Sequence, residues 1–178
     1  MIYADHAATT KISETAKLAM LSAMEKDWYN PSSLYTPGQQ ASGTLMDARV
    51  RIAHCLGCLP KEIYFTSGGS EADNQAILSA AAIGKRQGKM HIISTAFEHH
   101  AVLHTLKKLE KEGFEITLLD VGEKGIVSPA QVEKAIRPDT ALVTVMYANN
   151  EIGTIQPIRE IGAICRKNGV LFHTDAVQ

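Results

Sequence analysis

From residue 63 to its last residue, the chain alternates short apolar runs with helix-forming segments. Five runs have the length and composition of buried strands: Ile63–Thr66, His91–Ser94, Glu115–Leu119, Ala141–Met146 and Val170–His173. The four segments between them predict helices at about Ser70–Ile83, His99–Glu112, Pro129–Ile136 and Ile158–Lys167. Strands joined by helical crossovers lie side by side and parallel, so we predict an α/β fold with one mostly parallel sheet and helices on both faces.

Residues before this alternation predict a short opening strand at Ile2–Tyr3 and two helices. Ser13 is placed to cap the first helix, and Gly57 is placed to end the second. Further along, Ser128 and Gln131 form a capping box with Pro129 at the first helical position.

Composition excludes several classes of protein. The 178 residues are 45% hydrophobic and 21% charged, which suits one globular core. A net charge of −1 provides no long-range attraction for nucleic acid or an anionic membrane. The N-terminal sequence has no signal-peptide pattern, and three cysteines (Cys55, Cys58 and Cys165) are too few for a disulfide framework. We therefore expect a cytoplasmic protein whose thiols are buried or incidental.

The pattern contains no linker or internal repeat that would indicate a second independent domain. The chain stops at Gln178, just beyond a strand and without a covering helix, so we expect a fold that is cut short. We interpret residues 1–178 as a single truncated domain: residues 1–30 form an N-terminal arm and helix, and residues 60–178 form the alternating core.

Ligands bind parallel sheets at the carboxyl ends of their strands, where this sequence places polar residues. Thr66-Ser-Gly-Gly-Ser70 leads from a strand into a helix, and its glycines allow close approach of an anion to free backbone N–H groups. Phosphate is the expected anion, and a plain turn capped by Ser67 or Ser70 is the alternative. The motif matches neither the dinucleotide fingerprint nor the phosphate loop of nucleoside triphosphatases.

Three other strand ends carry His99, the pair Asn149 and Asn150, and Asp175 with Gln178 one turn later. Each has a structural alternative, as a helix cap or an Asn turn. Together they supply a flat imidazole, amides and a carboxylate beside a phosphate cradle, which are the groups that pyridoxal 5′-phosphate needs. His100 and His104 have the i, i+4 spacing of a zinc site, but neither the glutamate nor the third ligand is evident, so we expect no metal.

Six motifs in order resemble the cysteine desulfurases of the class V aminotransferase group. They are Asp5-His-Ala-Ala-Thr-Thr10, Asn30-Pro-Ser-Ser33, Thr66-Ser-Gly-Gly-Ser-Glu-Ala-Asp-Asn74, Glu98-His99, Asn149-Asn-Glu-Ile-Gly153 and His173-Thr-Asp-Ala-Val-Gln178. The resemblance implies the large domain of a fold-type I, pyridoxal-phosphate-dependent transferase. It also implies removal of sulfur from L-cysteine to give L-alanine and an enzyme persulfide, a homodimer, and sulfur delivery to a scaffold protein in iron–sulfur cluster assembly.

The resemblance also implies a role for each site residue, with His99 as the catalytic candidate. Gly69 and Ser70 bind the phosphate, His99 stacks on the pyridine ring, Asn150 and Gln178 reach the phenolic oxygen, and Asp175 pairs with the pyridinium nitrogen.

Other family features are not found in these residues. The lysine that forms the Schiff base and the cysteine that carries the persulfide lie further along in the family, and none of the twelve lysines here follows Asp175. Tyr35 stands where desulfurases often have histidine. We therefore expect the chain to be inactive by itself.

Three alternatives remain. The first is another enzyme of the same group, a selenocysteine lyase or a transaminase. The second is a serine hydrolase that uses Ser70, Asp120 and His173, since Gly68-Gly-Ser70-Glu-Ala72 approximates a nucleophile elbow. The third is a binding or assembly module without catalysis.

Overall fold

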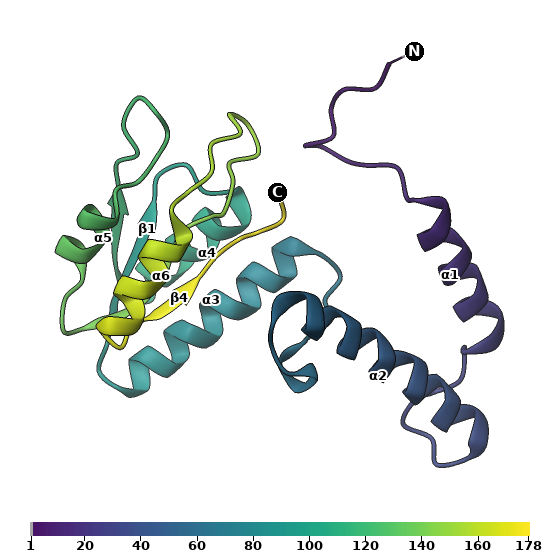
Figure 1. Ribbon diagram of the computed structural model, residues 1–178. Coiled ribbons are helices and arrows are strands. Elements are labelled where there is room, and N and C mark those ends of the chain that lie inside the picture. Colours follow the sequence, from purple (N-terminus) through teal and green to yellow (C-terminus); the bar gives the residue numbers. More distant parts are fainter. Residues whose placement is uncertain (1) are drawn as a thin grey trace. The chain divides into compact units, whose positions relative to one another are not determined.

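The computed structural model describes residues 2–178, which divide into two compact units (Figure 1). The first unit comprises residues 2–65 and the second residues 66–178. Every candidate site residue of the sequence analysis lies in the second unit.

The second unit is built on a parallel sheet of four strands in the order β2-β1-β3-β4. Its strands are β1 (His91–Thr95), β2 (Glu115–Leu119), β3 (Thr140–Thr144) and β4 (Leu171–His173). Its helices are α3 (Gly69–Arg86), α4 (His100–Lys111), α5 (Pro129–Ala135) and α6 (Ile158–Lys167). The chain crosses from each strand to the next through a helix, so all carboxyl ends of the strands meet at one edge.

Helices cover both faces of the sheet because neighbouring strand residues point to opposite sides. Ile92 and Leu142 pack against α3 and α4 in one buried cluster. Ile93 and Val143 pack in a second cluster with residues of α5 and α6. The predicted fold class, a mostly parallel sheet with helices on both faces, is confirmed.

Most predicted elements are confirmed to within a few residues. Ser13 caps its helix by accepting a hydrogen bond from the N–H of Ala16, and Gly57 ends the next helix in the left-handed conformation with φ of 68°. The capping box of Ser128 and Gln131 is also present.

Two predicted strands are wrong. Residues Ile2–Tyr3 and Ile63–Thr66 have no strand structure, so the sheet has four strands among residues 2–178 and not five. The side chains of Tyr64 and Phe65 are exposed, although their composition favours β-structure. A strand needs a partner for its backbone hydrogen bonds, and these segments pair with none in the described chain.

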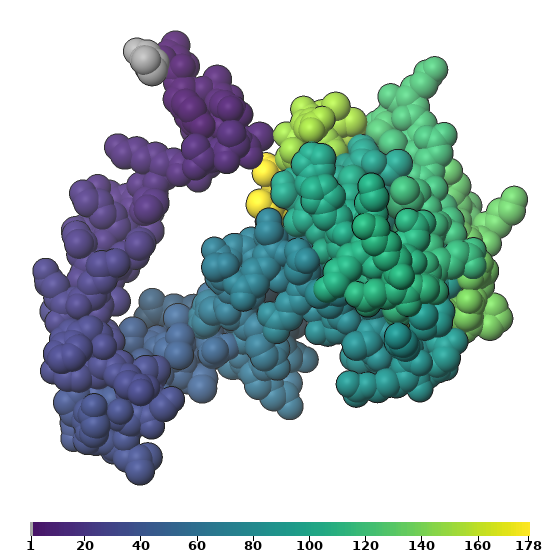
Figure 2. All heavy atoms as spheres, turned by 180° about the vertical axis from the view of Figure 1, so that it is seen from behind, coloured from purple at the N-terminus to yellow at the C-terminus, as the bar shows by residue number. Residues whose placement is uncertain are grey.

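The first unit consists of α1 (Glu14–Lys26), α2 (Thr36–Leu56) and the single 3₁₀ turn η1 (Pro60–Glu62). None of the residues of α1, all of which are described, is buried, and Figure 2 shows the atoms of this N-terminal segment (purple) as spheres. Large apolar side chains such as Leu18, Met24 and Trp28 are exposed on this unit. Within residues 2–178, no helix is long and apolar enough to cross a membrane.

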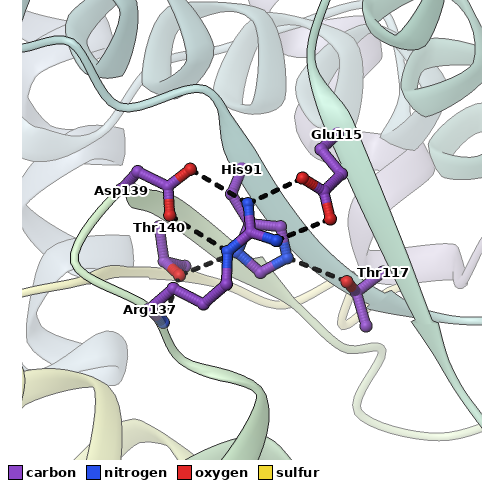
Figure 3. Close-up of polar contacts among 6 residues, drawn as sticks. All are labelled: His91, Glu115, Thr117, Arg137, Asp139 and Thr140. Atoms are coloured by element: carbon purple, nitrogen blue, oxygen red, sulfur yellow. Dashed lines mark hydrogen bonds and ion pairs between the residues drawn. The ribbon is translucent and has the colours of Figure 1, made fainter.

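A buried histidine joins three strands at the amino edge of the sheet (Figure 3). Both ring nitrogens of His91 lie within hydrogen-bond distance of threonine hydroxyls, 2.8 Å from Thr140 and 2.9 Å from Thr117. The Thr140 hydroxyl also accepts the N–H of Arg137 at 2.8 Å. The Arg137 guanidinium in turn bonds the carboxylates of Glu115 and Asp139. Burial lowers the pKa of His91, which favours the neutral ring.

Replacing Thr140 by Val is expected to lower the free energy of unfolding by about 1–3 kcal/mol, because a buried ring nitrogen and a backbone N–H lose their partner. Urea denaturation measures the change. Ser94→Ala on the adjacent strand is the matched control, since the Ser94 hydroxyl is buried without a partner among the described residues. Equal losses in both variants would contradict the assignment of stability to this network.

Candidate functional site

The strand order places a binding crevice between β1 and β3. From β1 the chain crosses outward to β2, then returns past β1 to β3 and continues to β4. Loops on either side of such a reversal leave a crevice at the carboxyl ends of the strands, where open α/β sheets bind ligands. Here the loop after β1 carries Glu98 and His99, and the loop after β3 carries Asn149 and Asn150.

The start of α3 is shaped as an anion site. Its N-cap is Gly68, which has no side chain to cap the helix. The first helical hydrogen bond runs from the N–H of Ala72 to the carbonyl of Gly68, so the N–H groups of Gly69 and Ser70 point out of the helix end. Ser67 does not cap the helix, because it donates its hydroxyl and its N–H to Oε2 of Glu71 at 2.6 and 2.7 Å. The alternative of a plain turn, in which Ser67 or Ser70 caps the helix, is therefore not observed.

The segment after β4 passes directly beside this helix start. A Cβ atom built on Gly69 would lie 2.6 Å from Cγ2 of Val177, so no larger residue fits at position 69 without a shift. Asp175, two residues earlier, is 7% exposed and accepts the N–H of Val177 at 3.0 Å. The backbone carbonyl of Asp175 accepts the N–H of Tyr147 at 2.7 Å. The anion site and the Asp175 carboxylate thus belong to the same edge of the sheet.

His99 begins α4 as its N-cap residue. Its Nδ1 accepts the N–H of Ala101 at 3.2 Å, which leaves Nε2 to carry the proton of the neutral ring. The side chain is exposed, so one ring face is available to a flat ligand. The structural and functional interpretations of His99 are compatible, because the cap uses one nitrogen and leaves the ring free.

Two side chains tie the loop after β1 to the loop after β3. Glu98 Oε1 accepts the backbone N–H of Met146 at 3.1 Å, and Asn149 Nδ2 donates to the carbonyl of Phe97 at 3.1 Å. Asn149 also accepts two N–H groups of its own turn, so its role is structural. Asn150, its neighbour, is half-exposed at the rim of a cavity of about 420 Å³ that His99 also lines.

Two buried carboxyl groups behind these loops, those of Asp73 and Glu98, are held against ionisation. Burial, and then repulsion from Asp175, raises the pKa of Asp73 to about 6, whereas a charged His99 lowers it. Burial raises the pKa of Glu98 to about 7, against the hydrogen bonds from Thr95 and Met146 that lower it. The site can therefore hold protons on carboxyl groups near neutral pH.

His173 connects β3, β4 and α3 under the site. Its Nδ1 lies 2.8 Å from the Thr144 hydroxyl, and its Nε2 lies 3.5 Å from a carboxylate oxygen of Asp73. Burial lowers the pKa of His173 even though Asp175 raises it, which favours a neutral ring that donates toward Asp73. This arrangement fixes the start of α3 relative to the end of β4.

The structure brings Gly69, Ser70, His99, Asn150 and Asp175 to the carboxyl edge of the sheet. Gln178 lies three residues beyond Asp175 and is exposed, with contacts of its own within the structure.

Asp73 and Glu98 were not predicted as site residues, although each belongs to one of the six motifs. A signal existed for Asp73, since it precedes the buried Ile77 by four residues and so shares the inner face of α3.

The serine hydrolase alternative is wrong. Asp120 follows β2 and His173 lies in β4, at opposite edges of the sheet and about 14 Å apart at strand spacing. Among residues 2–178 no three His, Cys, Asp or Glu side chains are grouped closely enough to hold a metal ion. Of the thiols, Cys165 is buried, which raises its pKa to about 11, and Cys55 is exposed.

Comparison with known proteins defines the class to which this fold and site belong. Residues 2–178 match the family described as aminotransferase class-V, and the chain belongs to that family.

Several of its relatives within the family are named cysteine desulfurases. The chain is 51% identical to the putative cysteine desulfurase IscS 1 of Bacillus subtilis (strain 168) and 50% identical to the cysteine desulfurase IscS of Methanosarcina thermophila. Both alignments cover 99% of this chain, but only 46% and 44% of the relatives, so the chain spans less than half of their length.

Solved structures agree with this grouping. A NifS-like protein matches with a TM-score of 0.93 at 37% identity, over 98% of this chain and 48% of that one. A protein described as SspA in complex with cysteine also matches with a TM-score of 0.93, at 40% identity over 99% of this chain and 50% of the other. These matches show that the four-stranded unit and the helices before it follow the fold of NifS-like enzymes.

Proposed function

We propose that this chain is part of the large domain of a pyridoxal-phosphate-dependent cysteine desulfurase, which converts L-cysteine to L-alanine and an enzyme persulfide. The observation that carries the proposal is the juxtaposition of the uncapped start of α3 with the buried carboxylate of Asp175, bridged by the contact of Gly69 with Val177. Family membership and the names of the relatives support it.

The residues present fit this cofactor. Gly69 and Ser70 would bind its phosphate through outward N–H groups and the positive end of the α3 dipole. Glycine is needed at position 69 because the Cβ atom of any other residue would lie too close to Val177. Asp175 would pair with the pyridinium nitrogen. When bound, the cofactor supplies an electron-withdrawing ring that stabilises negative charge on the α-carbon of an amino acid.

The chain's own residues would orient and insulate that ring. His99 would stack on one face, held by its hydrogen bond from Ala101. Asn150 and Gln178 would donate to the phenolic oxygen. His173, through its contact with Asp73, would keep the phosphate site and Asp175 at a fixed separation.

Titration of the 178-residue chain with pyridoxal 5′-phosphate, followed by visible absorbance, tests the proposal. We expect saturable binding, and binding weaker by roughly 100-fold for pyridoxal, because about 3 kcal/mol of charge-assisted hydrogen bonding to the phosphate is lost. Ser70→Ala keeps the backbone N–H but removes the hydroxyl, which would also donate to the phosphate, so it should weaken binding of the phosphorylated form only. Ser79→Ala, an exposed residue of the same helix, serves as the control. Equal affinity for both ligands would argue against the phosphate site.

The finer parts of the proposal concern the whole protein. We propose L-cysteine as its substrate, a homodimer as its working form, a scaffold protein of iron–sulfur cluster assembly as its sulfur acceptor, and the cytoplasm as its location. One structural neighbour, SspA, is described in complex with cysteine, which favours cysteine over selenocysteine or a transamination substrate. Measuring alanine release from cysteine and from selenocysteine with the whole protein would distinguish these reactions.

A further inference from the structure

Glu98 is a buried carboxyl group that is only half satisfied. Its side chain is 4% exposed. One oxygen, Oε1, accepts the Thr95 hydroxyl at 2.6 Å and the Met146 N–H at 3.1 Å. The other oxygen, Oε2, is buried and has no hydrogen-bond partner among the described residues.

This geometry disfavours a charged Glu98. An ionised carboxylate spreads its charge over both oxygens, and leaving one of them buried without a donor is expensive. The titratable groups that face it add to the penalty: Asp73 on α3 and Asp175 after β4 are both acidic and both repel a charge on Glu98. His99, the next residue, acts on Asp73. A proton on Oε2 removes the repulsion and keeps both hydrogen bonds to Oε1.

The bonds to Oε1 join the segments that form the crevice. Thr95 is the last residue of β1, and Met146 follows β3 by two residues. Glu98 therefore fixes the turn that begins α4, and with it the position of His99.

We propose that Glu98 is a positioning residue that acts as a neutral carboxylic acid: it holds the loop carrying His99 against the end of β3 and leaves Asp175 as the negative charge of the site. The proposal deepens the proposed function, on which its cofactor part rests. Glutamine at position 98 would reproduce the neutral shape, whereas alanine would release the loop.

The test compares the 178-residue chain with its Glu98→Gln and Glu98→Ala variants, and uses Glu112→Gln at the exposed end of α4 as the matched control. Carboxyl-carbon NMR of labelled glutamate should show one group still protonated at pH 6, and its signal should vanish only in Glu98→Gln and Glu98→Ala. Ring-nitrogen NMR of His99 should be unchanged in Glu98→Gln and shifted in Glu98→Ala.

Affinity for pyridoxal 5′-phosphate provides a third measurement. We expect Glu98→Gln to bind within about twofold of the unmodified chain and Glu98→Ala to bind about tenfold more weakly, the equivalent of one lost hydrogen bond. If Glu98→Ala does not fold, Thr95→Val replaces it, because that change removes one donor to Oε1 and should also shift the His99 signals.

An ionised Glu98 at pH 6 would overturn the neutral form. Unchanged His99 signals in Glu98→Ala, or in Thr95→Val where that variant replaces it, would overturn the positioning role. If no chain binds the cofactor while both NMR results are as expected, the proposed function fails. The role of Glu98 as a neutral residue that positions His99 is then still supported.

Discussion

Replacing Asp175 by Asn is expected to weaken binding of pyridoxal 5′-phosphate by roughly 30-fold or more, since losing one partner of a buried charge pair costs about 2–5 kcal/mol. Asparagine keeps the size of the side chain and can still accept the N–H of Val177, so the backbone of the segment should hold its position. What it removes is the negative charge that would meet the pyridinium nitrogen. Absorbance titration at constant pH measures the loss.

Asp120→Asn is the matched control for this result. Asp120 also follows a strand of the sheet, accepts a backbone N–H two residues later, and is exposed at the end of the edge strand β2. Its replacement should leave cofactor affinity unchanged. Comparable losses in the two variants would show that a general charge effect, and not the position of Asp175, controls binding.

Glu98→Gln is expected to raise the free energy of unfolding at pH 8 by about 1–3 kcal/mol, and to change it little at pH 4. The pKa of Glu98 is raised from 4.5 in the unfolded chain to about 7 in the folded one. Between these values the folded state binds more protons, so its stability falls as pH rises. At pH 8 the folded protein holds a buried negative charge on Glu98, and the glutamine side chain removes that charge.

Urea denaturation of both chains at several pH values tests this prediction. His91 and His173, whose pKa values burial lowers, act in the opposite direction and increase stability as pH rises toward 6.5. Their contribution is the same in both chains and disappears from the difference between them. A difference that is constant from pH 4 to pH 8 would contradict the raised pKa of Glu98.

The sequence predicted most helices of both units and the four strands of the sheet because each of these elements carries its own local signals. Caps such as Ser128 and glycines such as Gly57 set helix ends through contacts within a few residues, which a sequence displays directly. The segment Ile63–Thr66 failed as a strand for the opposite reason. Its composition favours extended structure, but whether a partner strand exists depends on chain far away, which local composition does not encode.

In the candidate site, too, some features could be predicted from the sequence and others could not. Strand ends pointed to His99 and Asp175 because the topology of a parallel sheet places them together. The coupling of Glu98 and Asp73 to Asp175 was missed, since it depends on depth of burial and on three carboxyl groups from separate elements. The six site residues stay predictions, of which the binding experiments above test Ser70 and Asp175. The division of the domain into residues 1–30 and 60–178 also stays a prediction.

The strand order also has a consequence for how the protein folds. Glu98 and Met146, which close the crevice, are 48 residues apart in the chain, and the whole of β2 and α5 lies between them. Closing that long loop is entropically unfavourable until β3 docks beside β1, and such distant pairings slow folding. The crevice is therefore assembled late, and a nascent chain acquires its binding surface only after β3 has been synthesised.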